Sequence, residues 1–210
     1  PRTAALREYD LAVAPVHLDP GHPLLQSLAI PVISHHVAVR WILGKDRPSP
    51  FVEITGSRGK TTTACALAHA MDGPGILHTS AGTYRFPEHE QIGKKSITPA
   101  SVLPAAEEAS RTGGWLIAEV SLGCTGAGDY GIITSGEDYL FAGKKRHALV
   151  EKVRSAQSMP RFLVAPGIDA PGAVRVEDVA VSQGDSCTCC CGGRTTAFTS
   201  PLLSVESYRT

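Results

Sequence analysis

Two nearly continuous apolar runs, WLIAEVS at 115–121 and YGIITS at 130–135, do most to limit how this chain can fold. Strands with one solvated face alternate polar and apolar residues, whereas strands inside a parallel sheet are apolar on both faces. FVEIT at 51–55 and RFLVAPG at 161–167 read as further strands, and helices are expected over 60–71, 100–110 and 144–157. This alternation predicts an α/β fold with a parallel sheet and flanking helices.

The regions on either side of this unit differ from it. Residues 9–44 read as strand, helix, strand and helix, the end of another parallel α/β unit, and KDRPSP at 45–50 is a polar linker. From Val174 the segments become short and alternating, which predicts a β-hairpin or small antiparallel sheet. Within the helix expected at 100–110, Pro104 predicts a kink or break. The chain begins at Pro1, within what reads as a domain, so we expect a piece of a longer protein.

Composition excludes several classes of function. Twenty basic and twenty acidic residues cancel, which argues against a nucleic-acid-binding surface. No apolar run approaches the roughly 20 residues that span a bilayer, and no signal peptide opens the sequence. Four of the six cysteines, Cys187, Cys189, Cys190 and Cys191, follow no known metal-ligand spacing. We expect free thiols in a cytoplasmic protein, with a metal site as the alternative.

The turn GSRGKTTT at 56–63 lies between a predicted strand and a predicted helix. Such a turn aims backbone N–H groups and the positive end of a helix at one point, which is a phosphate site. Lys60 is expected to neutralise the β- and γ-phosphates, and the Thr61 hydroxyl to bind Mg²⁺. The predicted nucleotide-binding residues are Gly56, Ser57, Arg58, Gly59, Lys60, Thr61 and Thr62.

The shortened G-x-x-G-K-T spacing resembles the phosphate loop of the Mur ligase superfamily. AEVS at 118–121 is similar to the family's E-V-S-S stretch, GIITSGEDY at 131–139 to its T-N-x-x-x-D-H stretch, and ALVEKVRSA at 148–156 to the helix with its carbamylated lysine. The resemblance implies ATP and Mg²⁺ as cofactors, a carboxylate substrate activated as an acyl phosphate, and catalytic roles for Lys60, Glu119 and Lys152. Thr61 and Glu119 are the implied metal ligands.

The resemblance also divides the chain. Residues 1–48 correspond to the end of an N-terminal Rossmann-like domain, and residues 49–210 to the central ATP-binding domain. We expect no counterpart of the family's C-terminal domain within these 210 residues, since the sequence stops about where the central domain is expected to end.

Chemistry leaves alternatives open at several of these positions. Glu119 is either a ligand at the carboxyl edge of the sheet or a solvated strand end. Lys152 is either the carbamylated lysine or part of a solvated basic helix face. In the loop before the next helix, Lys94, Lys95 and Thr98 either bind an anionic substrate or lie on the surface. His35 and His36 are expected to start a helix rather than to bind metal.

The sequence departs from the family pattern at Leu122, Ser135 and Tyr139. Tyr139 replaces a histidine that helps to bind a second magnesium, so we expect one firm metal site, or a second one built on Asp138. Together with the region 75–99, these departures most resemble the branch of the superfamily that closes a carbocyclic ring on a nickel tetrapyrrole in methanogens. The alternatives are an amino-acid-adding ligase of cell-wall or pseudomurein type, and a P-loop ATPase that acts as a switch.

Overall fold

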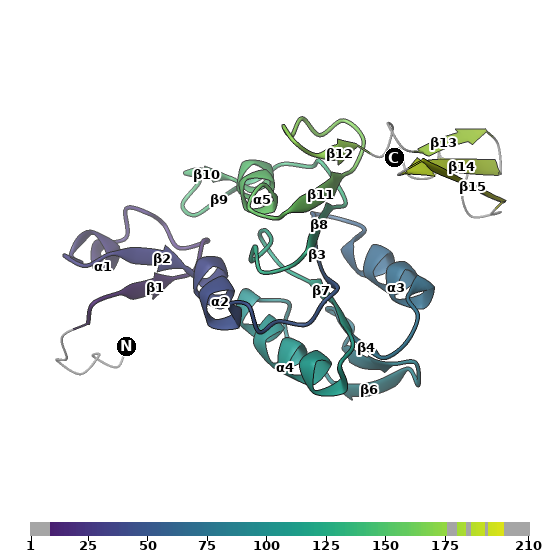
Figure 1. Ribbon diagram of the computed structural model, residues 1–210. Coiled ribbons are helices and arrows are strands. Elements are labelled where there is room, and N and C mark those ends of the chain that lie inside the picture. Colours follow the sequence, from purple (N-terminus) through teal and green to yellow (C-terminus); the bar gives the residue numbers. More distant parts are fainter. Residues whose placement is uncertain (1–8, 176–179, 184–185, 192, 200–210) are drawn as a thin grey trace.

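The computed structural model describes residues 9–175, 180–183, 186–191 and 193–199 (Figure 1). An eight-stranded sheet in the order β12-β11-β8-β3-β7-β4-β5-β6 forms its centre. The strands of this sheet are β3 (Phe51–Thr55), β4 (Gly75–His78), β5 (Thr83–Phe86), β6 (Glu90–Gly93), β7 (Trp115–Glu119), β8 (Tyr130–Ile133), β11 (Arg161–Val164) and β12 (Val174–Arg175). The four strands expected from the sequence are the adjacent strands β11, β8, β3 and β7, which confirms the α/β fold.

Helices cover both faces of the sheet (Figure 1). Helix α3 (Lys60–Ala70) packs its Ala64 and Ala68 against alternate residues of β3 and β7, among them Val52 and Ile117. Helix α4 (Val102–Thr112) covers the other face, where Phe51 and Leu116 are fully buried. Because both faces are covered, side chains at successive strand positions are buried, as the sequence predicted.

The N-terminal part forms a separate two-stranded parallel sheet. Its elements are β1 (Ala12–Ala14), α1 (Pro23–Gln26), β2 (Val32–Ser34) and α2 (His35–Leu43). Ser34 caps α2 by accepting the Val37 N–H, and Gly44, at a φ of 52°, ends it. Helix α2 also packs on the central unit, where its Val39 joins the core that contains Phe51.

Glu53 has no exposed surface and points away from α3, toward a glycine-rich segment at 123–128. Its carboxylate accepts hydrogen bonds from the Thr125 N–H, the Thr125 hydroxyl at 2.9 Å and the Gly128 N–H at 2.8 Å. Burial raises the pKa of Glu53, while these donors act in the opposite direction. This buried carboxylate therefore holds the glycine-rich connection from β7 to β8 in place.

Three local expectations were wrong. The sheet is mixed rather than parallel throughout, because β5 and β6 run antiparallel to their neighbours. The helix expected at 144–157 begins only at Ala148, as α5 (Ala148–Ala156), after a short hairpin of β9 (Leu140–Phe141) and β10 (Arg146–His147). Pro104 neither kinks nor breaks α4, because it lies in the first turn, where a helix needs no N–H donor.

The C-terminal segments form two structures. Val174 and Arg175 pair in parallel with β11 at the edge of the main sheet. Beyond them, β13 (Ala180–Gln183), β14 (Ser186–Cys191) and β15 (Arg194–Thr199) form a three-stranded antiparallel sheet, as the alternating pattern predicted. Within the described part of the chain, no helix is long and apolar enough to cross a membrane.

The cysteine cluster lies on β14. Cys190 is exposed and its thiol is free. The side chains of Cys187, Cys189 and Cys191 lie outside the described residues. Among the side chains that are described, no group of three or more His, Cys, Asp or Glu residues is arranged to hold a metal ion.

Candidate active site

The predicted site residues gather at the carboxyl edge of the central strands. β3 lies between β8 and β7, with Ile54 opposite Glu119 and Thr55 opposite Ile133. The phosphate loop follows β3, Glu119 ends β7, and Thr134 follows β8. In an open parallel sheet this edge is where ligands bind. The same topology explains why segments about 60 and 80 residues apart in sequence meet there.

Glu119 is the centre of this cluster, and only 2% of its side chain is exposed. One carboxylate oxygen accepts hydrogen bonds from the Thr61 hydroxyl at 2.8 Å and the Ser80 N–H at 3.0 Å. The other oxygen lies 3.7 Å from the Lys60 ammonium. Glu119 is therefore not a solvated strand end, and its charge is matched by Lys60.

The two implied metal ligands suit Mg²⁺ chemically. Hydroxyl and carboxylate oxygens are hard donors, and Mg²⁺ commonly takes one or two protein ligands together with water and phosphate oxygens. Neighbouring ligands of an octahedral ion at 2.0–2.1 Å lie about 2.9 Å apart. The Thr61 and Glu119 oxygens are joined by a hydrogen bond of 2.8 Å, so both lie near one point, and an ion bound there would replace this bond. That they bind Mg²⁺ stays a prediction.

The phosphate loop is already fixed in shape by residues 134–137. The Ser135 hydroxyl accepts the N–H groups of Ser57 at 2.8 Å and of Arg58 at 3.0 Å. The Arg58 side chain is exposed and pairs with Glu137. Both N–H groups predicted to bind phosphate at 57 and 58 therefore already have an acceptor in this structure.

The remaining donors of the loop come from the start of α3. Gly59, with a φ of 80°, precedes the helix and makes no side-chain cap, so the first N–H groups of α3 have no partner within the helix. These groups belong to Lys60, Thr61 and Thr62. An anion at this end would meet them and the positive end of the helix dipole together. Gly56 cannot carry a side chain without striking Thr134.

Lys152 is buried, with 1% of its surface exposed, which excludes the solvated helix face. Its ammonium donates to the Ser57 hydroxyl at 2.8 Å and lies 5.2 Å from the centre of the Tyr139 ring. Burial, and secondarily the charge of Lys60, lower the pKa of Lys152. A larger fraction of neutral amine favours reaction with CO₂, but carbamylation itself stays a prediction.

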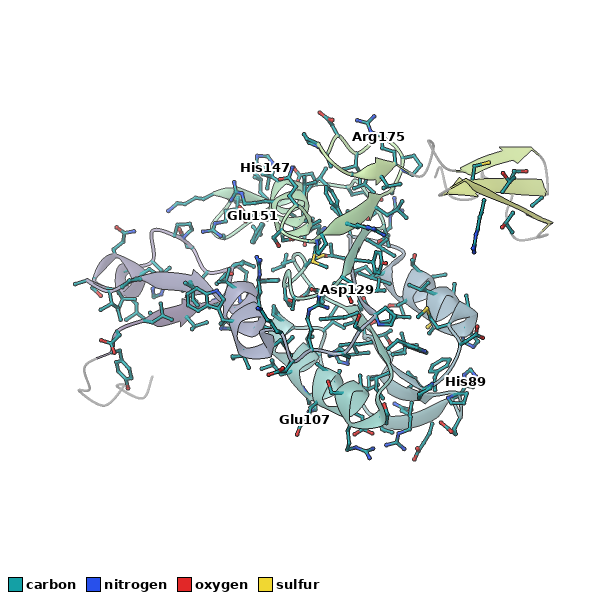
Figure 2. The ribbon with its side chains drawn as sticks, viewed as in Figure 1. His89, Glu107, Asp129, His147, Glu151 and Arg175 are labelled. Carbon is teal, nitrogen blue, oxygen red and sulfur yellow. The ribbon has the colours of Figure 1, made fainter. Side chains whose placement is uncertain are left out.

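Asp138, the residue of the alternative second metal site, makes internal contacts. Asp138 accepts hydrogen bonds from His147 Nδ1 at 2.6 Å and from the Leu149 N–H at 2.9 Å. These bonds lower the pKa of Asp138. His147 lies beside α5 (Figure 2). Asp138 therefore joins the loop after β8 to the start of α5, and a second metal site built on it stays a prediction.

The loop with Lys94, Lys95 and Thr98 is exposed, and it reaches the same edge of the sheet. The Ser121 N–H donates to Ile97 O at 2.8 Å, two residues beyond Glu119. Thr98 itself shares hydroxyl hydrogen bonds with Ser96 and Ser101. The loop is thus close to the cluster, and whether it binds substrate stays a prediction. His35 and His36 start α2, as expected.

Sequence reasoning missed Ser80 and His78, which lie at the end of β4. Ser80 contacts both Glu119 and Thr61. His78 is 1% exposed and bonds to Thr83 through Nδ1, and burial lowers its pKa. The available signal was the apolar strand GILH followed by the small residues TSAG, the pattern of a strand end at this edge.

Comparisons with known proteins identify a solved structure with a similar fold and one protein that is similar in sequence. No family model matches the chain. A solved UDP-N-acetylmuramoyl-L-alanyl-D-glutamate–2,6-diaminopimelate ligase superposes on 88% of the chain and 47% of its own length, with a TM-score of 0.55 and 12% identity. The chain therefore shares its fold with this ligase, in agreement with the resemblance of the motifs.

One relative is much more similar in sequence. The chain is 40% identical over 145 residues to the coenzyme F(430) synthetase of Methanosarcina acetivorans, a match that covers 61% of the chain and 30% of that protein. The chain thus matches less than a third of the length of this curated relative.

Proposed function

We propose that this chain is the nucleotide-binding part of an ATP-dependent ligase of Mur type, which activates a substrate carboxylate as an acyl phosphate. The observation that carries the proposal is the convergence of Lys60, Thr61 and the Ser80 N–H on buried Glu119 beside a phosphate loop. A switch ATPase also has a phosphate loop, but buried Lys152 beside that loop, at the position of the family's carbamylated lysine, favours a ligase.

In the proposed reaction, the residues of this chain position and neutralise the nucleotide. The free N–H groups at the start of α3 bind phosphate oxygens, and Lys60 leaves Glu119 to stabilise charge on the γ-phosphate. Thr61 and Glu119 would hold Mg²⁺, which supplies further charge neutralisation. Because the carboxylate is a poor electrophile, its phosphorylation replaces an anionic oxygen by a good leaving group, and a nucleophile then displaces phosphate.

The finer proposal concerns the substrate. The 40% identity to coenzyme F(430) synthetase supports a nickel tetrapyrrole whose propionate side chain is activated and whose ring carbon then attacks, in the biosynthesis of the methanogenesis coenzyme F(430). An intramolecular attack needs no amino-acid pocket, and positioning alone supplies much of the acceleration.

The test supplies the complete protein with ATP, Mg²⁺ and either the nickel seco-tetrapyrrole acid or a panel of amino acids with muramyl-peptide or pseudomurein precursors. We expect ADP, phosphate and a new ring ketone with the tetrapyrrole acid alone, identified by mass spectrometry. A product heavier by one amino-acid residue would establish the amino-acid-adding alternative. ATP hydrolysis that is indifferent to any carboxylate would establish the switch.

A further inference from the structure

A cavity of about 960 Å³ lies at the amino-terminal edge of the sheet, away from the cluster around Glu119. Its wall includes Ser49 before β3, residues 126–128 before β8 and Pro160 before β11, and the phosphate loop follows the other end of β3. The five residues of β3 separate the two ends by about 16 Å. The cavity thus lies apart from the cluster around Glu119, and its volume lies within the usual range of about 300–1,000 Å³ for ligand pockets.

Cationic side chains dominate the polar part of this wall. Arg40 and Lys45 are exposed, and Arg47 lies beside them. No carboxylate is among the described residues that line the cavity. Two acids lie near the wall: exposed Asp46, between Lys45 and Arg47 in sequence, and Asp129, which is labelled in Figure 2. Asp129 accepts hydrogen bonds from Arg47 at 2.6 Å and from the Phe51 N–H at 2.8 Å.

Arg47 uses one of its two terminal nitrogens in this pairing. Its Nη2 atom bonds to Asp129, but Nη1 is buried and has no hydrogen-bond partner among the described residues. Because Nη1 is closed to solvent, Arg47 contributes its charge to the cavity wall rather than an open donor. Arg40 and Lys45 add two mobile charges around the same space.

An aromatic ring completes the wall. Trp41 on α2 is 61% exposed, whereas Trp115, the other tryptophan, is 3% exposed in the core. Large aromatic rings are usually buried to a high degree, and one that stands open beside cations offers a stacking surface for a flat ring.

We propose that this cavity binds a planar organic anion with two or more phosphate or carboxylate groups. Its ring stacks on Trp41, and its acidic groups meet Arg40 and Lys45, beside the charge of Arg47. Nucleotides and porphyrin carboxylates share this chemistry, and the experiment distinguishes them. The proposal does not depend on the ligase reaction, because none of these residues belongs to the cluster around Glu119.

The test measures tryptophan fluorescence of the complete protein in a Lys60→Ala background, which weakens binding at the phosphate loop. ADP and coproporphyrin are the planar probes, and pyrophosphate is the probe without a ring. The difference in fluorescence between the complete protein and its Trp41→Phe variant isolates the signal of Trp41 from that of Trp115 and of any tryptophan elsewhere in the complete protein. We expect one planar probe to quench fluorescence saturably, more tightly than pyrophosphate, and less tightly as salt increases.

The variants Arg40→Gln and Lys45→Gln should each weaken this binding about tenfold, and Trp41→Phe should remove most of the quenching. All three side chains are exposed, so the fold should tolerate these changes. Arg154→Gln, which removes an exposed cation from α5, is the matched control and should leave binding unchanged. Absence of binding by both planar probes, or equal weakening in the control, would overturn the proposal. The tighter of the two planar probes identifies the ligand class.

Discussion

Replacement of Lys60 by alanine separates the catalytic role of this residue from its structural role. In the structure its ammonium lies 3.7 Å from Glu119, and 17% of the side chain is exposed. At an effective dielectric constant of 20, the attraction at this distance is about 4 kcal/mol, but desolvation offsets most of it, which leaves about 1 kcal/mol. The substitution by alanine removes the ion pair, which destabilises the protein. It also removes a positive charge from the start of α3, where that charge interacts unfavourably with the helix dipole, and this stabilises the protein by about 0.3–1 kcal/mol.

The two effects nearly cancel, so the free energy of unfolding should change by no more than about 1 kcal/mol. For a domain of this size that is a shift in Tm of about 2–4 °C. Glu119 keeps its bonds from Thr61 and Ser80, so its buried charge remains solvated by the protein. Turnover should behave differently, because removal of one preorganised charge stabiliser typically lowers the rate by about 10²–10³.

The assay is ADP release by the complete protein, with Tm measured on the same samples and Arg154→Ala as the control for loss of a surface cation. We expect low turnover with nearly normal Tm in Lys60→Ala only. Near-normal turnover would refute the assignment of the phosphate loop. A large fall in Tm would instead show that the ion pair with Glu119 carries the local structure.

Three further changes test other parts of the structure. Glu119→Gln should keep both hydrogen bonds but raise the Mg²⁺ concentration needed for ADP release at least about tenfold. The control Glu107→Gln, at an exposed position, should leave that concentration unchanged. An unchanged Mg²⁺ dependence in Glu119→Gln would show that Glu119 is not a metal ligand. Because burial lowers the pKa of Lys152, its ammonium loses a proton at lower pH in the native state than in the unfolded state. The free energy of unfolding, relative to that of Lys152→Met, should therefore rise with pH up to the unfolded pKa of about 10.5. Denaturant titrations in which this difference does not change with pH would contradict the prediction. Glu53→Gln should lower the free energy of unfolding in urea by about 2–3 kcal/mol, because the NH₂ group of the glutamine would face backbone N–H donors. An unchanged free energy of unfolding would show that contacts other than those of Glu53 hold the 123–128 segment.

The sequence was most informative where one local pattern determines structure. The buried strands and the turn at 56–59 require little beyond apolar runs, glycines and a helix start. The same holds for Glu119, because a charge at the end of an apolar strand emerges at the ligand-binding edge of the sheet.

The sequence was least informative where contacts between residues far apart in the chain determine the local structure. The residues Lys144, Lys145 and Arg146 read as helix, but the Asp138 carboxylate bonds the Leu149 N–H and α5 starts only at Ala148. The burial of Lys152 depends on its bond to Ser57, 95 residues earlier. Ser80 approaches Glu119 only because β4 lies beside β7. No periodicity encodes such contacts.

The bond between His36 and Ser121 has a mechanical consequence. His36 Nε2 lies 3.0 Å from Ser121 O, and Ser121 follows Glu119 by two residues. Helix α2 begins directly after β2, with Ser34 as its cap, so a force that moves the N-terminal two-stranded sheet acts on α2. Because this helix is fastened to the strand end that carries Glu119, it cannot shift without straining or breaking that bond. Helix α2 therefore couples a displacement of the N-terminal sheet to the position of Glu119, the central carboxylate of the proposed ATP site.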